Sequence, residues 1–168
     1  MTLNRDYSSI SRFLHEITAA EVMTSPVHTI KQDEDFAEVA KKFVDYGIRH
    51  LPVVDGERRI IGVMTKRDLF RTVAPRKAIE NNMEYSSDKI LDGLHYYSKD
   101  LLNQYILREV MVKNPVTAGE DASLGEIIHL MVGKKIGCIP IIRENKTVSG
   151  IITQVNILRK ADEIYTTQ

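Results

Sequence analysis

The stretch Gly62-Val63-Met64-Thr65-Lys66-Arg67-Asp68 marks a predicted passage from a strand into a helix. The apolar run that begins at Ile60 stops at Thr65, and apolar residues at helical spacing follow. Thr65 therefore falls at an N-cap position, where unpaired N–H groups and a partial positive charge suit an anion such as phosphate. Asp68, in the first helical turn, can accept hydrogen bonds from a pair of hydroxyls. Thr-x-x-Asp is also an ordinary capping box that only starts a helix, so this segment alone leaves both interpretations open.

A second copy of this stretch lies 88 positions later, from residue 62 to residue 150, as Gly150-Ile151-Ile152-Thr153-Gln154-Val155-Asn156. The same spacing relates Glu21-Val22-Met23 to Glu109-Val110-Met111. It also relates Leu51-Pro52-Val53-Val54 to Ile139-Pro140-Ile141-Ile142. Self-similarity at one fixed spacing indicates an internal duplication of a whole supersecondary unit.

Composition limits the class of protein. The chain has 168 residues, enough for one compact domain or two small ones that share a core. Lys+Arg and Asp+Glu both number 23, so the zero net charge argues against a general electrostatic affinity for nucleic acid or an anionic membrane. No apolar stretch approaches a membrane span, and the N-terminus lacks the pattern of a signal peptide. We therefore expect a cytoplasmic protein, in which the single Cys138 is a buried hydrophobe.

The order of apolar patterns predicts an α+β fold made of two pseudo-symmetric β-α-β-β-α units that pair through their sheets. Each unit has a helix with a continuous apolar stripe, a face that it cannot bury alone. The expected boundaries are a lead helix or tail at residues 1–19, a first repeat at 20–71, an insert at 72–107 and a second repeat at 108–168.

The insert is expected to be helical. Apolar residues recur in it at spacings of three and four, which predicts one long amphipathic helix or two shorter ones: Ile90, Leu94, Tyr97, Leu101 and Tyr105. Such a helix can simply pack on the body of the protein, or it can form a dimerisation surface, a partner surface or a lid. The pattern does not choose between these roles.

The duplicated unit, with its Gly-apolar-x-Thr-x-x-Asp ending and its apolar-Pro-apolar-apolar strand, resembles the tandem cystathionine-β-synthase (CBS) domain pair. The resemblance covers nearly the whole chain except the N-terminal lead and the insert. It implies a pseudo-symmetric module with two clefts for an adenosine-containing ligand such as AMP, ADP, ATP or S-adenosylmethionine. It also implies a homodimer, and a regulatory role in which ligand binding, as in energy sensing, is signalled to a partner protein.

The resemblance assigns site residues in the first repeat. Thr65 matches the threonine that contacts phosphate or ribose, and Asp68 matches the aspartate that binds the ribose hydroxyls. Lys66 and Arg67 lie between them, and the pair Arg49-His50 stands where some members place basic residues against phosphate. His50 has an equally good interpretation as a strand histidine without a ligand. An apolar slot for adenine is expected around four residues: Val27, Ile48, Val116 and Ile136.

The second repeat departs from this pattern. Thr153 is present, but Asn156 replaces the aspartate and Gly137-Cys138 replaces the basic pair. Asparagine offers one uncharged oxygen as acceptor, and hydrogen bonds to charged acceptors are about twice as strong. The second cleft is therefore expected to be weak, empty or tuned to another ligand.

Three other functions compete with a nucleotide-binding module. An enzyme is disfavoured, because the five His show no metal-ligand spacing and no P-loop, Rossmann or Gly-x-Ser-x-Gly motif occurs. No metal and no cofactor beyond the adenosine ligand are expected. A structural or dimerisation module with degenerate clefts is the main alternative, and Asn156 favours it for one cleft. A DNA-binding regulator is more remote, since no helix-turn-helix or zinc-finger pattern is present.

Overall fold

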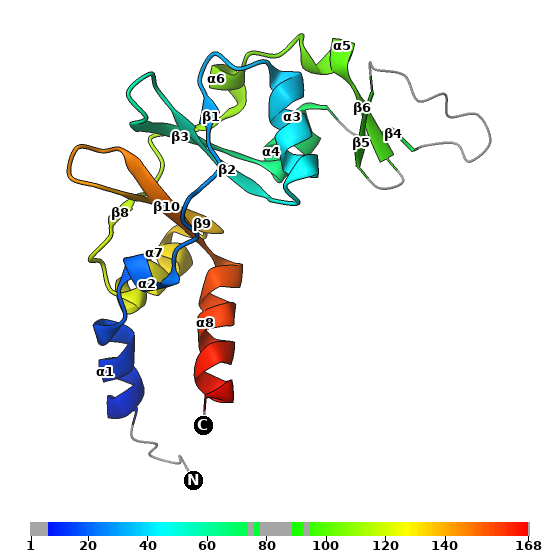
Figure 1. The fold of residues 1–168 in the computed structure, drawn as a ribbon. Coiled ribbons are helices and arrows are strands. Elements are labelled where there is room, and N and C mark those ends of the chain that lie inside the picture. The colour runs from blue at the N-terminus through cyan, green and yellow to red at the C-terminus, as the bar shows by residue number, and fades with distance from the viewer. Residues whose placement is uncertain (1–6, 74–75, 78–88, 93–94, 168) are drawn as a thin grey trace. The chain divides into compact units, whose positions relative to one another are not determined.

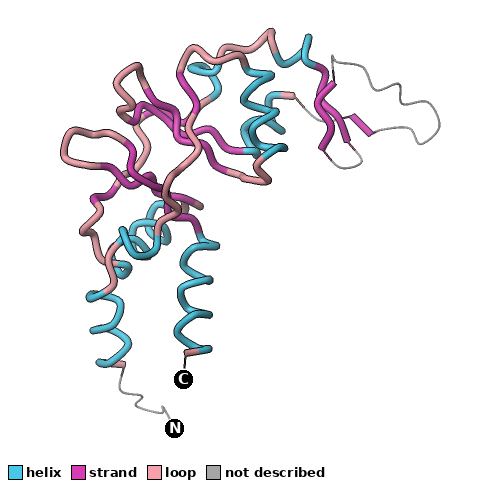
Figure 2. The backbone as a smooth tube through the Cα atoms, viewed as in Figure 1, coloured by secondary structure: helices cyan, strands magenta, loops and turns pink. Residues whose placement is uncertain are grey.

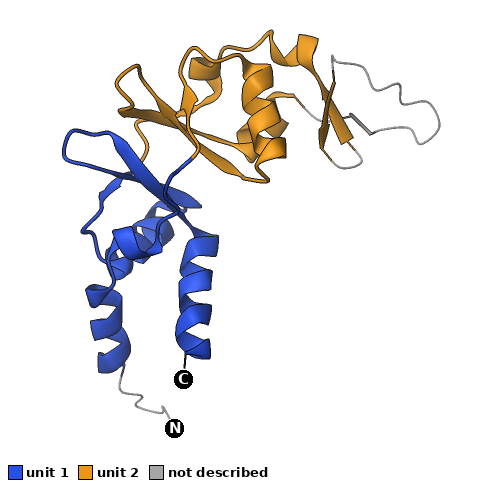
Figure 3. Ribbon diagram, in the orientation of Figure 1, with its two compact units in different colours: residues 1–27, 116–168 blue, residues 28–115 orange. Residues whose placement is uncertain are grey.

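The computed structural model describes residues 7–73, 76–77, 89–92 and 95–167, and it contains short strands flanked by helices (Figures 1 and 2). The chain forms two compact units (Figure 3). Unit 1 combines Met1–Val27 with Val116–Gln168, and unit 2 is His28–Pro115. Each unit is therefore built around one of the two sequence copies.

Unit 2 is built around the first copy. Its elements are β1 (Ile30–Lys31), α3 (Phe36–Asp45), β2 (His50–Val54), β3 (Ile60–Thr65) and α4 (Lys66–Thr72). β1 is parallel to β2, and β2 is antiparallel to β3, with His50 opposite Thr65. After α6 (Leu107–Val110), the short strand β7 (Val112–Lys113) pairs with β3 and completes a sheet of order β1-β2-β3-β7.

Unit 1 repeats this plan. It contains β8 (Ala118–Gly119), α7 (Leu124–Lys134), β9 (Cys138–Ile142), β10 (Val148–Thr153) and α8 (Gln154–Thr166), with a sheet of order β10-β9-β8. β8 is parallel to β9, and Thr153 of β10 lies opposite Cys138 of β9. The leading helix α1 (Ser8–Glu16) and the short helix α2 (Ala19–Val22) belong to this unit. The predicted β-α-β-β-α order is thus confirmed in both copies.

The first residues of each repeat, up to Val27 in the first and up to Pro115 in the second, belong to the unit that contains the rest of the other repeat. Thr24, just after α2, forms a bridge with Ile151 of β10, with both backbone hydrogen bonds made. In unit 2, β7 takes the matching place beside β3. The close approach of these segments requires the glycines of the motif. A Cβ at Gly62 would lie 2.6 Å from Sδ of Met111, and a Cβ at Gly150 would clash with Sδ of Met23.

The helical insert predicted between the copies is wrong for the residues that the structure describes. β4 (Arg76–Lys77), β5 (Lys89–Asp92) and β6 (His95–Ser98) form an antiparallel sheet of order β4-β6-β5, and only the short helix α5 (Lys99–Leu102) follows. Ile90 lies directly opposite Tyr97 across the β5–β6 pair. Their spacing in sequence, which resembles two helical turns, is therefore a cross-strand contact. Leu94, another member of the predicted stripe, lies outside the described residues.

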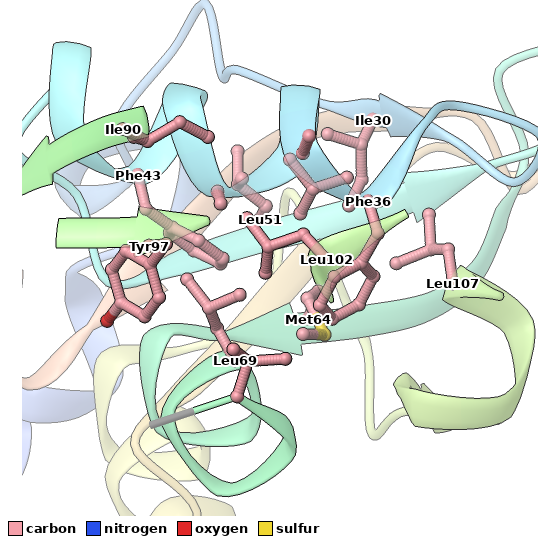
Figure 4. Packing of buried hydrophobic residues seen from close by; sticks show 14 of the residues in the cluster. Ile30, Phe36, Phe43, Leu51, Met64, Leu69, Ile90, Tyr97, Leu102 and Leu107 are labelled. Carbon is pink, nitrogen blue, oxygen red and sulfur yellow. The ribbon is translucent and has the colours of Figure 1, made fainter. Parts of the chain in front are cut away.

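The described part of the insert packs on the body of unit 2. Ile90, Tyr97 and Leu102 are buried in one cluster with Phe43 and Leu69 (Figure 4). β5 and α5 both contact α3. Of the roles left open by the sequence, these residues fill the first, because they extend the hydrophobic core.

Candidate functional site

Thr65 and Asp68 lie where β3 passes into α4, and they form a complete capping box. Oδ2 of Asp68 accepts from the backbone N–H of Thr65 at 3.1 Å and from its Oγ1 at 2.6 Å. The N–H of Asp68 donates to Thr65 Oγ1 at 3.1 Å. The cap uses only Oδ2 of the carboxylate. Oδ1 of Asp68 accepts no hydrogen bond from any described residue. A half-exposed, charged acceptor therefore stands beside the helix N-terminus.

Basic side chains surround this cap. The N–H of Lys66 donates to the carbonyl of Arg49 at 3.0 Å, which fixes the start of β2 against the start of α4. Burial lowers the pKa of His50 below its ordinary value of 6.5, and the charges of Arg49 and Arg67 lower it further, whereas Asp68 raises it. Within the described ranges, neither Arg49 nor Arg67 forms an ion pair. The site thus holds two uncompensated guanidinium groups.

Lys66 differs from these two arginines because its charge is already paired. Its Nζ lies 2.9 Å from Oδ1 and 2.7 Å from Oδ2 of Asp92 in β5. Both side chains are about a third exposed. The predicted ligand role of Lys66 therefore competes with a structural role in which it fastens the β5–β6 hairpin. Sequence reasoning missed Asp92, because no local pattern links residues 26 positions apart.

In the second copy of the cap, the side chain of Asn156 has no free hydrogen-bonding group. Oδ1 of Asn156 accepts from the N–H of Thr153 at 2.9 Å and from its Oγ1 at 2.6 Å. Its Nδ2 donates to the carbonyl of Val22 at 3.2 Å and to Oγ1 of Thr24 at 2.9 Å. The side chain is 7% exposed and makes all the hydrogen bonds that an amide can make. Asn156 therefore acts as a structural tie between α8 and the segment after α2.

The residues opposite Thr153 also lack groups that could bind an anion. Cys138 stands at the position of His50, opposite Thr153, and Gly137 stands at the position of Arg49. Burial raises the pKa of the Cys138 thiol to about 12. The start of β9 thus contributes neither a cation nor a reactive thiolate.

The predicted site residues fall into two sets, one in each unit. Unit 2 holds the charged set around Thr65 and Asp68 together with Ile48, which packs on the core cluster. Unit 1 holds Thr153 and Asn156 with the other three apolar candidates, Val27, Val116 and Ile136. Of these three, Ile136 packs on the core of unit 1. The apolar slot expected for adenine remains a prediction.

The described residues contain neither a metal-binding cluster nor a membrane-spanning helix. No three His, Cys, Asp or Glu side chains there are grouped closely enough to hold a metal ion. None of the helices in that part of the chain is long and apolar enough to cross a membrane.

Two copies of one β-α-β-β-α unit, each with a threonine cap at the last helix, define a tandem-repeat α+β protein. The model of the CBS domain family matches residues 19–75 and 107–163. The chain belongs to the CBS domain family, as the sequence motifs predicted.

Related sequences include two enzymes of methanogens. Homoserine O-acetyltransferase of Methanococcus vannielii is 28% identical over 148 residues, which are 88% of this chain and 25% of that protein. Inosine-5′-monophosphate dehydrogenase of Methanocaldococcus jannaschii is 28% identical over 156 residues, which are 90% of this chain and 26% of the enzyme. The chain spans about a quarter of the length of these relatives.

Solved structures of similar fold include two CBS proteins. The CBS domain pair of protein MJ0100, in complex with 5′-methylthioadenosine and S-adenosyl-L-methionine, has a TM-score of 0.66 and 21% identity over 88% of this chain and 97% of that one. CBSX2 in complex with AMP has a TM-score of 0.66 and 20% identity over 88% of this chain and 98% of its own. These likenesses establish the fold of a tandem CBS pair.

Proposed function

We propose that this chain is a regulatory module that binds an adenosine-containing nucleotide, AMP, ADP or ATP, at the cap formed by Thr65 and Asp68. The proposal rests on two observations: Oδ1 of Asp68 accepts no hydrogen bond from a described residue, and the guanidinium groups of Arg49 and Arg67 form no ion pair with one. A carboxylate oxygen is a strong acceptor for ribose hydroxyls, and arginine is suited to phosphate.

The charge of the site favours a nucleotide over S-adenosylmethionine. Two cationic side chains near His50 would repel a sulfonium group, whereas they attract phosphate. The complexes of related CBS pairs with AMP and with 5′-methylthioadenosine and S-adenosyl-L-methionine support an adenosine ligand in general. The phosphate preference comes from the residues of this chain alone.

One nucleotide per chain is expected. Asn156 makes all its hydrogen bonds within unit 1, and Gly137 and Cys138 supply no cation. The second copy of the motif therefore serves structure rather than binding. The alternative function, a structural module with degenerate clefts, thus applies to the second copy alone, and the first copy is the proposed nucleotide sensor.

The downstream partner is another protein or protein region. Sequences like this chain make up about a quarter of two named enzymes. That arrangement supports a regulatory module that passes its ligand state to a catalytic one. We also propose a cytoplasmic location, since the single thiol, Cys138, is buried and unpaired.

Calorimetric titration of the full chain with AMP, ADP, ATP, S-adenosylmethionine and 5′-methylthioadenosine tests the proposal. The sharpest variant is Asp68→Asn, because Asn156 already shows that asparagine can cap a threonine in this fold. Loss of one charged acceptor should weaken nucleotide binding about tenfold to a hundredfold. Arg49→Ala should weaken phosphate-bearing ligands more than 5′-methylthioadenosine.

Asp45→Asn and Arg12→Ala are matched controls, since Asp45 of α3 and Arg12 of α1 are exposed and neither forms a hydrogen bond or an ion pair with Thr65 or Asp68. Both controls should bind like the parent. Binding by Asp68→Asn equal to that of the parent would disprove the site assignment. A parent that binds none of the five compounds would disprove the sensing function and leave Thr65 and Asp68 as a capping box alone.

A further inference from the structure

Lys66 lies between the cap residues Thr65 and Asp68 in the sequence, but its charge is directed toward another part of unit 2. Its Nζ lies 2.9 Å from Oδ1 and 2.7 Å from Oδ2 of Asp92 in β5, so the amine contacts both oxygens of one carboxylate. The two side chains are 35% and 27% exposed, so a dissolved ligand can reach the pair. The cation next to Thr65 is thus neutralised by an acid 26 positions away.

The ion pair is a minor part of what holds the β5–β6 hairpin in place. Ile90 of β5, Tyr97 of β6 and Leu102 of α5 are buried in the core of unit 2 (Figure 4). Burial of large apolar side chains stabilises a contact far more than a partly exposed ion pair does. The hairpin should therefore stay on the core when Lys66 releases Asp92, and the pair can open without unfolding of unit 2.

The second copy of the motif shows that the fold does not require a charge at this position. The 88-residue spacing places Gln154, which is exposed and uncharged, at the position of Lys66. Gln154 begins α8 as Lys66 begins α4. The cation and its acidic partner occur instead in the unit that holds the open Oδ1 of Asp68. This coincidence connects the ion pair to the proposed binding site.

We propose that Asp92 is an intramolecular competitor of the nucleotide phosphate for Lys66. The inference rests on the proposed function, the binding of a nucleotide at the cap. When a phosphate enters beside Arg49 and Arg67, the flexible stem of Lys66 moves its amine from the carboxylate to the phosphate, which bears more charge. Asp92 then lacks its partner and repels the ligand. Asp92 thereby lowers the affinity of the site for phosphate and sets the nucleotide concentration at which the sensor responds.

Calorimetric titration of the full chain with adenosine, AMP and ATP tests this role. Asp92→Asn keeps the shape of the side chain and removes its charge, so Lys66 is free for the ligand. The variant should bind AMP about fivefold more tightly than the parent, the upper range for a partly exposed ion pair. The gain for ATP should be at least as large. Adenosine has no phosphate, so its affinity should not change.

Lys66→Gln breaks the same ion pair from the other side, and Gln154 shows that the fold accepts glutamine at this position. This variant should weaken AMP binding about fivefold. The two variants thus shift the affinity for AMP in opposite directions, whereas loss of a purely structural ion pair would shift it in one direction. Lys41→Gln and Asp45→Asn are matched controls, because they break an exposed ion pair of α3 by the same substitutions. Both should bind AMP like the parent.

The possible results separate the competition from the proposed function. If the parent binds AMP and Asp92→Asn binds it no more tightly, the competition is refuted and the proposed function stands. An equal gain in Asp45→Asn, or weaker binding in both Asp92→Asn and Lys66→Gln, would also refute the competition. If Asp92→Asn binds AMP and the parent binds no nucleotide, the competition is supported and the proposed function is refuted. Absence of binding in both proteins would overturn the two proposals together.

Discussion

Asn156 donates its Nδ2 to Oγ1 of Thr24 at 2.9 Å, across 132 residues of sequence. The same nitrogen donates to the carbonyl of Val22, while the amide oxygen caps α8 through Thr153. One side chain therefore joins the N-terminal segment to the second copy of the repeat. Among the described residues, the side chain of its counterpart Asp68 hydrogen-bonds only within the cap, and a carboxylate has no donor to offer to a carbonyl.

Asn156→Ala should destabilise the fold by about 2–4 kcal/mol, since it removes a helix cap and leaves buried acceptors without a donor. Asn156→Asp should cost at least as much, because it keeps the cap but turns a carboxylate oxygen toward the carbonyl of Val22. Urea unfolding at pH 7 measures both. Asp68→Ala is the control and should lose only about 1 kcal/mol, the value of the cap. Parent-like stability of Asn156→Asp would contradict the structural role.

His50 should make stability depend on pH. Burial, Arg49 and Arg67 lower its pKa below 6.5 in the folded state. The unfolded chain then binds more protons as the pH falls through 6.5, so acid favours unfolding. Stability should be full above pH 6.5 and should fall below it until the lowered pKa is reached. His50→Gln should flatten this part of the profile.

Urea midpoints of the parent and His50→Gln between pH 8 and pH 5.5 measure the effect. Bound phosphate beside His50 would raise its pKa and draw in a proton, so AMP binding to the parent should be accompanied by proton uptake near pH 6.5. Calorimetry in buffers of different ionisation enthalpy detects that uptake. Parallel pH profiles for the two proteins would show that His50 does not titrate as described.

The repeated architecture could be predicted because several independent signals recur at the same spacing. The threonine caps, the apolar-Pro-apolar-apolar strands and the helix stripes all agree, and local patterns of this kind are what sequence displays best. The cap between Thr65 and Asp68 was predictable for the same reason. Its hydrogen bonds join residues three positions apart.

The β5–β6 hairpin was not predicted, although a signal was present. Asp92-Gly93 in the sequence is a turn dipeptide between two short runs rich in apolar and aromatic residues. The spacing of Ile90 and Tyr97 fits a helix as well as a cross-strand pair, so the spacing alone does not distinguish the two. The exchange of short segments between the two copies had no local signal at all, since its contacts join residues about 50 positions apart where β7 meets β3 and more than 130 apart where Asn156 meets Val22 and Thr24.

Lys135 ends α7 in the left-handed conformation, with φ 54° and ψ 42°. Its counterpart in the first copy is Gly47, with φ 61°. A residue with a side chain pays strain in this region that glycine avoids. Lys135→Gly should therefore stabilise the protein by about 0.5–1 kcal/mol, and Gly47→Lys should destabilise it by a similar amount. Thermal melts of both variants check this, and a loss of stability in Lys135→Gly would contradict it.

Gly62 and Met111 should be energetically coupled. A Cβ on Gly62 would lie 2.6 Å from Sδ of Met111 and 3.0 Å from the carbonyl oxygen of Val112, so β7 or the methionine must move. Gly62→Ala should cost about 1–3 kcal/mol through overpacking. Gly56→Ala is the control, because nothing lies within 4 Å of a Cβ there, and it should change stability by less than about 0.5 kcal/mol.

The coupling can be isolated with a double-mutant cycle. Met111→Ala loses packing of its own, but it opens the space that a Cβ on Gly62 needs. Gly62→Ala should therefore cost about 1 kcal/mol less in the Met111→Ala background than in the parent. Urea unfolding of the four proteins measures the interaction energy. Costs that simply add, within the roughly 0.5 kcal/mol expected of distant sites, would mean that Met111 does not press on Gly62. The glycine of the motif would then need a different explanation from the close approach of β7 to β3.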